Sequence, residues 1–407
     1  MGAGLGGLLV AWRARAAGED VVVHEAAEHV GGETRTAVRD GWRVEHGAWF
    51  LPGAAPAQGL SLAAAGRLGL RPLLGRVAQA GPRGLTPLWT PARRRRAALR
   101  DGLAPRPRAV ASSAANESLE SFARRRFGPA TTEDVVRPVA QLLTGFGPER
   151  VGIADALPAW LAREARHGRV GVQTFAALDG RAPLGWTSAG GLAALVERLR
   201  ADLGACVQTA CRVVEVVPGG DPSSARVVDE AGATSAPGTV TLAVPHDEQV
   251  RLLRRAAPAL ADQLAGERGV DGVRVVIAWT HGEDGPATPP YVAAVRGRSR
   301  LRVRGVLFPA ALDVSAVPDT GACAVAWLGG AHDPHAAGEP EGKLVRRVLA
   351  DLALVLGRRV RPHFVEVQRR AGDVRAPWPG RRARLLEPLR ALAGAGVELV
   401  ERPAWRV

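Results

Sequence analysis

The sequence predicts an α/β protein with two domains. Its 407 residues, 46% of them hydrophobic, exceed the roughly 250–300 residues at which single hydrophobic cores usually divide. A glycine motif at the start of the chain is followed by an Ala-rich helical stretch and a short apolar strand, an alternation typical of α/β folds. Further strand-like apolar runs, such as 275–279, alternate with helical stretches later in the chain. This composition excludes disordered and fibrous classes.

The first predicted element is a glycine-rich turn that opens a helix. Its GxGxxG motif consists of Gly2, Gly4 and Gly7. Residues 8–17 are predicted to be helical and 21–23 to form a buried strand, which Glu25 follows. Such glycines let backbone N–H groups approach a pyrophosphate at the helix N-terminus, and an acid about 20 residues further on accepts hydrogen bonds from a ribose. Motif, helix, strand and acid in this order predict a dinucleotide-binding βαβ unit.

One strand of such a unit has no counterpart in the sequence. The strand expected before Gly2 would be a central one of about 5–6 residues, and each apolar side chain buried there would contribute roughly 1.5–3 kcal/mol. Their sum is comparable with the roughly 5–15 kcal/mol that stabilises a whole domain. We therefore expect either that the true start of the protein lies upstream or that the gene is a decayed copy.

Two segments after the acid indicate the cofactor. Residues 28–36 contain a glycine pair, Gly31 and Gly32, and residues 40–48 contain the E-x-G segment that ends in Gly47 and Ala48. Together with GxGxxG and the acid, they resemble the flavin-dependent amine oxidase superfamily. In that superfamily a second glycine pair follows the ribose-binding acid, and the E-x-G segment passes beside the flavin. Paired glycines suit this role because a backbone without side chains can approach a cofactor closely.

The resemblance implies FAD as the cofactor and a set of residues around it. The superfamily usually has arginine where this chain has His29 and Glu33, which leaves Arg35 and Thr36 for phosphate contacts. Residues 211–214 would pass the adenine and residues 243–245 the flavin. The implied cofactor-binding residues are Gly2, Gly4, Gly7, Glu25, Gly31, Gly32, Arg35, Thr36, Gly47, Ala48, Cys211 and Ala243.

The later motifs are similar to those of one branch of the superfamily, protoporphyrinogen oxidase. The matching segments are the helices at 118–128 and 157–161, the turn at 145–150, the glycine-pair helix from 184–192, and 240–245, 305–309, 326–331 and 376–380. This branch implies an FAD-binding Rossmann-like domain with a discontinuous α+β substrate domain. We expect residues 1–58, 180–255 and 393–407 in the FAD-binding domain, and residues 59–179 and 256–392 in the substrate domain. The final flavin motif of the family has no counterpart, so we also expect a truncated cofactor site.

The resemblance implies an FAD-dependent oxidase that acts on CH–CH or CH–NH groups. Its expected reaction is the oxidation of protoporphyrinogen to protoporphyrin with oxygen as the acceptor, a step of heme biosynthesis. The alternatives are another FAD-dependent oxidoreductase, such as an isoprenoid or carotenoid desaturase or an amine oxidase, and an inactive truncated homologue. Amine-oxidising members generally place a lysine in a substrate-domain strand, whereas residues 275–279 are apolar and the only lysine is Lys343. An apolar, carboxylate-bearing tetrapyrrole would suit an apolar pocket with an arginine. No side chain is assigned as catalytic, because the cofactor carries the hydride chemistry.

Composition limits the expected partners and location. The net charge is +14, but the arginines are scattered among Ala, Gly and Pro, which disfavours nucleic-acid binding. The one run, residues 93–96, is expected to be a solvated face, and contact with an anionic membrane surface is the function that fits it best. Three cysteines without a CxxC pair, and the lack of a leader or an apolar run of about 18 residues, favour a cytoplasmic protein with at most peripheral membrane contact. His332 and His335 are typical of a polar turn, so no metal site is expected.

Overall fold

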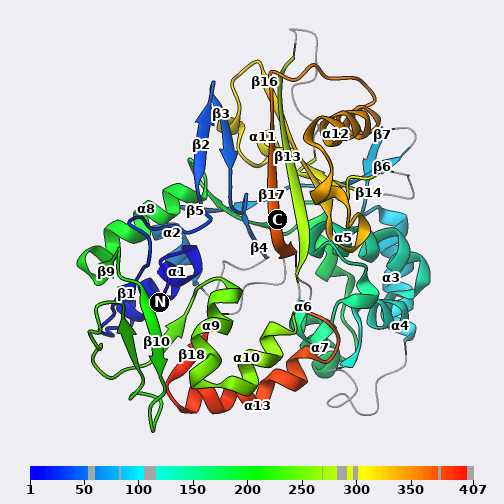
Figure 1. Cartoon of the computed structure of the whole chain (residues 1–407). Coiled ribbons are helices and arrows are strands. Elements are labelled where there is room, and N and C mark those ends of the chain that lie inside the picture. Colours follow the sequence, from blue (N-terminus) through cyan, green and yellow to red (C-terminus); the bar gives the residue numbers. More distant parts are fainter. Residues whose placement is uncertain are drawn as a thin grey trace.

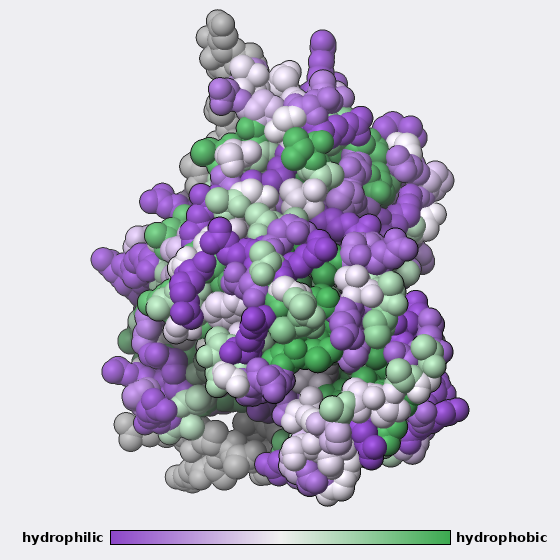
Figure 2. Space-filling model, turned by 90° about the vertical axis from the view of Figure 1, so that its left-hand side faces the viewer, coloured by the Kyte–Doolittle hydropathy of each residue, from purple (hydrophilic) through white to green (hydrophobic). Residues whose placement is uncertain are grey.

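The computed structural model describes residues 1–53, 60–81, 84–104, 116–267, 269–281, 291–296, 301–374 and 377–400. Helices and strands alternate through these ranges, so the predicted α/β class is confirmed. In Figure 1, α1 (Leu5–Ala16) and α8 (Leu192–Leu203) lie on the left, and the long strands β13 (Val270–Thr280) and β16 (Gly321–Gly329) run through the upper half. Figure 2 shows the left-hand face, where hydrophilic side chains predominate and hydrophobic ones are visible towards the middle.

A group of short parallel strands holds the glycine turn. Strand β1 (Val23–His24) pairs in parallel with β9 (Val207–Gln208), and β12 (Val240–Leu242) pairs in parallel with β18 (Val397–Leu399). Residues 1–3 bridge the two pairs. The N–H of Gly2 donates to the carbonyl of His24 (2.8 Å), and the N–H of Ala243 donates to the carbonyl of Met1 (2.9 Å). Helices α1 and α8 pack together against this group through a shared apolar cluster.

The largest sheet has seven strands in the order β17–β13–β16–β15–β14–β6–β7. The remaining strands of this sheet are β17 (Phe364–Val374), β15 (Gly305–Leu307), β14 (Ala293–Arg296), β6 (Val77–Gly81) and β7 (Gly84–Pro87). Neighbouring strands are antiparallel except β14 and β6, which are parallel. The apolar run 275–279 lies in β13 because both faces of that strand are buried. Val275 and Ile277 face one apolar cluster, whereas Val276 and Ala278 face another.

Three smaller sheets complete the β-structure of the described residues. They are the hairpin β2 (Thr36–Arg39) and β3 (Trp42–Glu45), the sheet β4 (Leu51–Pro52), β8 (Gly185–Ser188) and β5 (Leu70–Leu73), and the pair β10 (Val213–Val217) and β11 (Arg226–Asp229). The β2–β3 hairpin turns at Asp40 and Gly41, which both have positive φ (51° and 87°). An Asp-Gly pair is the sequence that such a two-residue turn requires.

Some of the helices in the described residues begin at a residue whose side chain caps the first turn. The remaining helices are α2 (Leu62–Arg67), α3 (Pro91–Leu103), α4 (Leu119–Thr131), α5 (Arg137–Thr144), α6 (Ile153–Ala156), α7 (Pro158–His167), α9 (His246–Ala256), α10 (Pro258–Ala265), α11 (Pro309–Leu312), α12 (Glu341–Leu356) and α13 (Arg381–Gly394). The predicted helix at 118–128 begins as expected, with the Ser118 hydroxyl accepting a hydrogen bond from the N–H of Ser121 (3.1 Å). Gly128, predicted as its end, breaks the helical backbone with φ +81°, but helical structure resumes at Pro129.

Short helical turns link these elements. A π-helical turn, Thr132–Val136, precedes α5, and together they form the helix predicted at 132–143. The 3-10 turns are Pro148–Arg150, Val172–Leu178, Gly204–Cys206, Val314–Ala316, Gly330–His332 and Ala336–Gly338. Among the described residues, none of the helices combines the length and the apolar character that crossing a bilayer requires.

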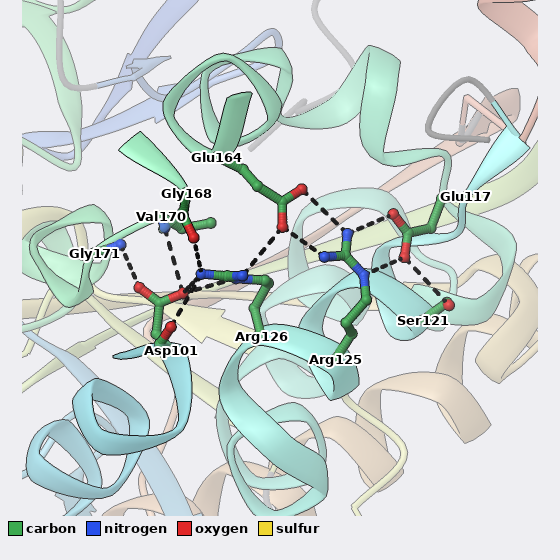
Figure 3. A network of polar contacts seen from close by, with 9 residues as sticks. All are labelled: Asp101, Glu117, Ser121, Arg125, Arg126, Glu164, Gly168, Val170 and Gly171. Atoms are coloured by element: carbon green, nitrogen blue, oxygen red, sulfur yellow. Dashed lines mark hydrogen bonds and ion pairs between the residues drawn. The ribbon is translucent and has the colours of Figure 1, made fainter. Parts of the chain in front are cut away.

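A buried network of charges joins three helices of the right-hand lobe (Figure 3). Arg126 of α4 is fully buried and donates to the Asp101 carboxylate of α3 (2.8 Å from Nε) and to the carbonyl of Gly168 (3.0 Å). Glu164 of α7 lies 3.4 Å from the same guanidinium and 2.5 Å from that of Arg125. Because each buried charge has an opposite charge beside it, the network fixes how α3, α4 and α7 pack.

The hydrophobic core divides into four clusters. Two surround the seven-stranded sheet and the helices beside it, and two surround the short parallel strands. Helices α10 and α13 contribute Leu260 and Leu385 to the cluster that also contains Leu242 of β12. The predicted domain boundaries stay a prediction, and residues 54–58 and 401–407 of the predicted FAD-binding segments lie outside the described residues.

Candidate functional site

The three motif glycines occupy different environments. Gly2 has φ +84°, and a Cβ on it would lie 2.7 Å from the carbonyl oxygen of Ala243. A Cβ on Gly7 would lie 2.0 Å from the carbonyl oxygen of Gly2, so α1 packs directly on the turn. Gly4 is the N-cap of α1, and no atom of the described residues lies within 4 Å of its Cβ position. Packing therefore requires Gly2 and Gly7, whereas Gly4 presents bare backbone to open space.

The predicted glycine pair borders the same open space. Gly31 donates from its N–H to the carbonyl of Ala3 (2.7 Å) and forms a parallel bridge with Gly4. A Cβ on Gly32 would lie 3.4 Å from the Cα of Gly4, and both glycines of the pair have positive φ (+101° and +58°). The first turn of α1 contains no acidic side chain. The N–H groups of the first turn, which have no partner within the helix, and the positive end of the helix fit the diphosphate of a dinucleotide.

Glu25 lies directly after β1, beside the turn. Its Oε2 accepts a hydrogen bond from the N–H of Ala3 (2.7 Å) and its Oε1 accepts one from the N–H of Ala27 (2.9 Å). Each carboxylate oxygen has a second acceptor site, so the side chain is held in place and can still accept from ribose hydroxyls. Cys211, which is a free thiol, lies next to it, because its N–H donates to the carbonyl of Glu25 (2.8 Å). The structure thus brings together the residues predicted for the adenosine half.

The residues predicted for the phosphates and the flavin differ in burial and in contacts. Arg35 is exposed, and its guanidinium lies 2.8 Å from Nε2 of His29. Gly47 is buried, and a Cβ on it would lie 2.7 Å from the carbonyl oxygen of Glu33. Ala48 packs against the cluster shared by α1 and α8. The predicted residue Thr36 is already engaged, because its hydroxyl donates to the carboxylate of Glu45 (2.7 Å).

Glu45 is a buried carboxyl group between the E-x-G segment and the start of α8. It is 1% exposed, and a Cβ on Gly191, the N-cap of α8, would lie 2.2 Å from its Oε1. Burial raises the pKa of Glu45 to about 7, against the smaller opposing effects of the Thr36 hydroxyl, the Arg43 charge and the backbone of Leu192. Glu45 therefore exchanges a proton close to neutral pH at the place where β3 meets α8.

The protonation of Glu45 should make the free energy of unfolding depend on pH. The pKa of Glu45 is higher in the folded protein (about 7) than its ordinary value of 4.5, so the folded state binds the proton more tightly between these pH values. The free energy of unfolding should therefore fall as the pH rises through this window, by about 3 kcal/mol for the whole shift. The Glu45→Gln variant should lack that part of the slope.

Urea unfolding of both proteins from about pH 5 to pH 8 measures this difference. Glu197→Gln is the matched control, because Glu197 lies on the exposed side of α8, the helix whose start contacts Glu45. An unchanged pH slope in Glu45→Gln would contradict the assignment.

A second buried charge cluster continues from Glu45 towards the substrate side. Arg43 lies 3.5 Å from Glu45 and donates to Asp313 (3.0 Å), which also pairs with Arg71 (2.6 Å). Burial alone would raise the pKa of Asp313, but hydrogen bonds from Ser315, Arg71 and Arg43 outweigh it and hold the pKa at about 2. Asp313 is therefore an anion at every pH at which the protein would work, and it anchors the β2–β3 hairpin against residues 309–316.

Arg274 links the largest sheet to the predicted flavin side. It is 4% exposed, lies in β13 directly before the apolar run 275–279, and donates to the carbonyl of Gly47. The sequence predicted an apolar strand at residues 275–279, and these residues do lie in β13. The strand extends further, however, and its buried charge reaches the E-x-G segment.

Sequence reasoning identified neither Glu45 nor Arg274 as a site residue. Glu45 lies in the predicted segment 40–48 and Arg274 directly before the predicted strand 275–279, but the contacts of each depend on residues far away in the chain, Leu192 and Gly47. The available signal was a charged residue at the edge of a segment that was predicted from its other residues. The turn at 332–335 is held by the Arg302–Asp333 ion pair (2.6 Å). No group of three or more metal-ligating side chains occurs in the part of the chain that the structure describes.

Comparison with protein families gives one match that spans most of the chain. The family model described as "Flavin containing amine oxidoreductase" matches residues 5–379. Among curated proteins no match is found.

Solved structures share the fold at low sequence identity. The "Putative protoporphyrinogen oxidase" from Exiguobacterium sp. 255-15 is 18% identical, with a TM-score of 0.71 over 98% of this chain and 92% of that one. Putrescine oxidase, wild type and bound to putrescine, is 19% identical, with a TM-score of 0.68 over 98% and 91%. Reduced UDP-galactopyranose mutase is 14% identical, with a TM-score of 0.66 over 100% and 90%. These similarities support the predicted FAD-binding Rossmann-like fold with a second α+β part.

Proposed function

The chain belongs to the flavin-containing amine oxidoreductase family and is an FAD-dependent oxidoreductase, and from this premise we propose that it oxidises protoporphyrinogen to protoporphyrin with oxygen as the acceptor. The GxGxxG turn supports the cofactor assignment, because Gly4 leaves room at a helix N-terminus for the FAD diphosphate. We assign the ribose to Glu25 and the flavin side to Gly47, Ala48 and Ala243.

Bound FAD would supply the hydride acceptor. The protein would position and shield it. Arg274 holds the carbonyl of Gly47 in place and would thereby fix the E-x-G segment beside bound FAD. Glu45 and Arg43 fix the E-x-G segment against α8 and Asp313.

The observation that carries the choice of substrate is the position of the single lysine. Lys343 lies on α12, is half exposed and pairs with Glu339 (3.5 Å). The buried cation of β13 is instead Arg274, whose guanidinium already donates to a backbone carbonyl. Arginine and lysine are not interchangeable, so Arg274 does not replace the strand lysine that amine-oxidising members generally have. This arrangement disfavours amine oxidation and leaves an apolar substrate as the better candidate.

Anaerobic mixing tests the proposal. We expect protoporphyrinogen to bleach the visible absorbance of the FAD-loaded protein and oxygen to restore it, with porphyrin fluorescence appearing in step. Putrescine should leave the flavin oxidised. Because protoporphyrinogen also oxidises slowly by itself, the flavin-free Gly4→Val variant serves as the background control.

The same experiment distinguishes the alternative functions. Bleaching by putrescine but not by protoporphyrinogen would favour an amine oxidase, and that activity should then be tested in Lys343→Met. Bleaching by a polyene alone would favour a desaturase. A protein that binds FAD but responds to no donor would be an inactive homologue.

A further inference from the structure

The arginine run 93–96 lies on α3, and one face of this helix packs on the protein. Arg93 donates to the carbonyl of Leu88 (2.6 Å) and to the side chain of Gln79 (3.0 Å). Ala97 is fully buried, and Asp101 is held in the buried network by Arg126. The spacing of residues 93, 97 and 101 places them on one side of the helix.

The opposite face of α3 is apolar in its middle and basic on both flanks. Ala92, Leu99 and Leu103 follow the helical spacing along this face, and Arg95 and Arg96 lie on either side of it. Leu99 is 65% exposed and Leu103 is 74% exposed. Helix α3 lies at the right-hand edge of the molecule in Figure 1.

The charge of this face is not balanced within the protein. Arg95 and Arg96 are exposed, and neither forms an ion pair with any of the described residues. The one acidic residue of α3, Asp101, is buried on the other side and paired with Arg126. A solvated surface helix normally has its leucines on the buried side and charges outside. Here leucines and unpaired arginines share the outer face.

We infer that this face of α3 docks on an anionic lipid bilayer. Arginine side chains can lie along the surface with their guanidinium groups at lipid phosphates, while leucines between them enter the boundary between headgroups and acyl chains. Exposed leucines between cations match a lipid surface, which offers anionic headgroups and apolar acyl chains together, better than an acidic protein, which offers anionic groups alone. This inference does not depend on the substrate proposed above.

Vesicle co-sedimentation of the FAD-loaded protein tests the inference. We expect binding to vesicles of phosphatidylcholine with about one-third phosphatidylglycerol, and little binding to phosphatidylcholine alone. The Arg95→Gln, Arg96→Gln double variant should lower partitioning roughly 30-fold, since each arginine near an anionic leaflet contributes roughly fivefold. The Leu99→Ala, Leu103→Ala double variant should lower it at least roughly tenfold.

A matched variant separates this face from the general positive charge of the protein. Leu354 is 64% exposed on α12, and Arg358 and Arg359 follow it on the surface. Leu354→Ala combined with Arg358→Gln and Arg359→Gln removes an exposed leucine and the same charge, and should change partitioning by less than about threefold. Thermal unfolding of all variants should match that of the unmodified protein.

Three results would overturn the inference. The first is that the unmodified protein does not sediment with anionic vesicles. The second is that the control variant loses binding as strongly as the α3 variants, which would show a general charge effect. The third is retention of the protein on immobilised polyglutamate without vesicle binding, which would identify an acidic protein as the partner.

Discussion

Replacing Gly4 by valine should abolish FAD binding and leave the fold intact. Gly4 has φ −67° and ψ 168°, a conformation that valine adopts readily, and its Cβ position has no neighbour within 4 Å among the described residues. The new side chain would fill the space assigned to the diphosphate and keep it from the N–H groups at the start of α1. Losing two charge-assisted hydrogen bonds at about 1.5–3 kcal/mol each weakens affinity roughly 100-fold or more.

Flavin titration of Gly4→Val, with thermal unfolding measured without FAD, checks both parts of this prediction. Gly66→Val is the matched control, because Gly66 is an exposed glycine of α2 that also has open space around its Cβ position. Gly7→Ala should behave differently and destabilise the protein itself, since its Cβ would meet the carbonyl oxygen of Gly2 at 2.0 Å. If Gly4→Val binds FAD like the unmodified protein, the diphosphate does not lie at this turn.

Replacing Arg126 by methionine should destabilise the protein by about 3–5 kcal/mol, because it leaves the buried carboxylate of Asp101 without its partner. Arg124→Met on the same helix is the matched control. Arg124 is 44% exposed and pairs with Glu120 and Glu133 at the surface, where such pairs contribute only about 0–1 kcal/mol.

Urea unfolding measures both variants, and a third variant tests the cause of the effect. Asp101→Asn added to Arg126→Met removes the unpaired charge, while the amide oxygen can still accept from one of the two N–H groups, of Val170 and Gly171, that Asp101 binds. The double variant should therefore recover part of the loss. A loss in Arg126→Met no larger than in Arg124→Met would show that the buried network does not hold the helices together.

Local sequence signals predicted the nucleotide-binding turn well. Glycines, helix, strand and acid lie within residues 2–25, and the geometry of such a turn depends mainly on which residues lack a Cβ. In the structure Gly2 and Gly7 are in close backbone contact and Glu25 accepts from the N–H of Ala3, while the roles of these residues in binding stay predictions. The roles of the individual glycines became visible only in the packing, where Gly7 faces the backbone of Gly2 and Gly4 faces open space.

Burial of charge could not be predicted from the sequence in the same way. Arg124, Arg125 and Arg126 are three identical neighbours, yet the first is exposed and the third fully buried, because helix rotation and the approach of α3 and α7 decide which one points inward. The pKa of Glu45 and the contact of Arg274 with Gly47 likewise depend on partners more than 140 residues away in the chain. Such long-range contacts leave no local pattern.

Titration of the unmodified protein with FAD tests the central claim most directly. We predict saturable binding with one FAD per chain, a change in the visible flavin spectrum on binding, and a higher melting temperature in the presence of FAD. A folded protein whose spectrum and melting temperature do not change as FAD is added would contradict the claim that the turn around Gly4 and Glu25 binds this cofactor.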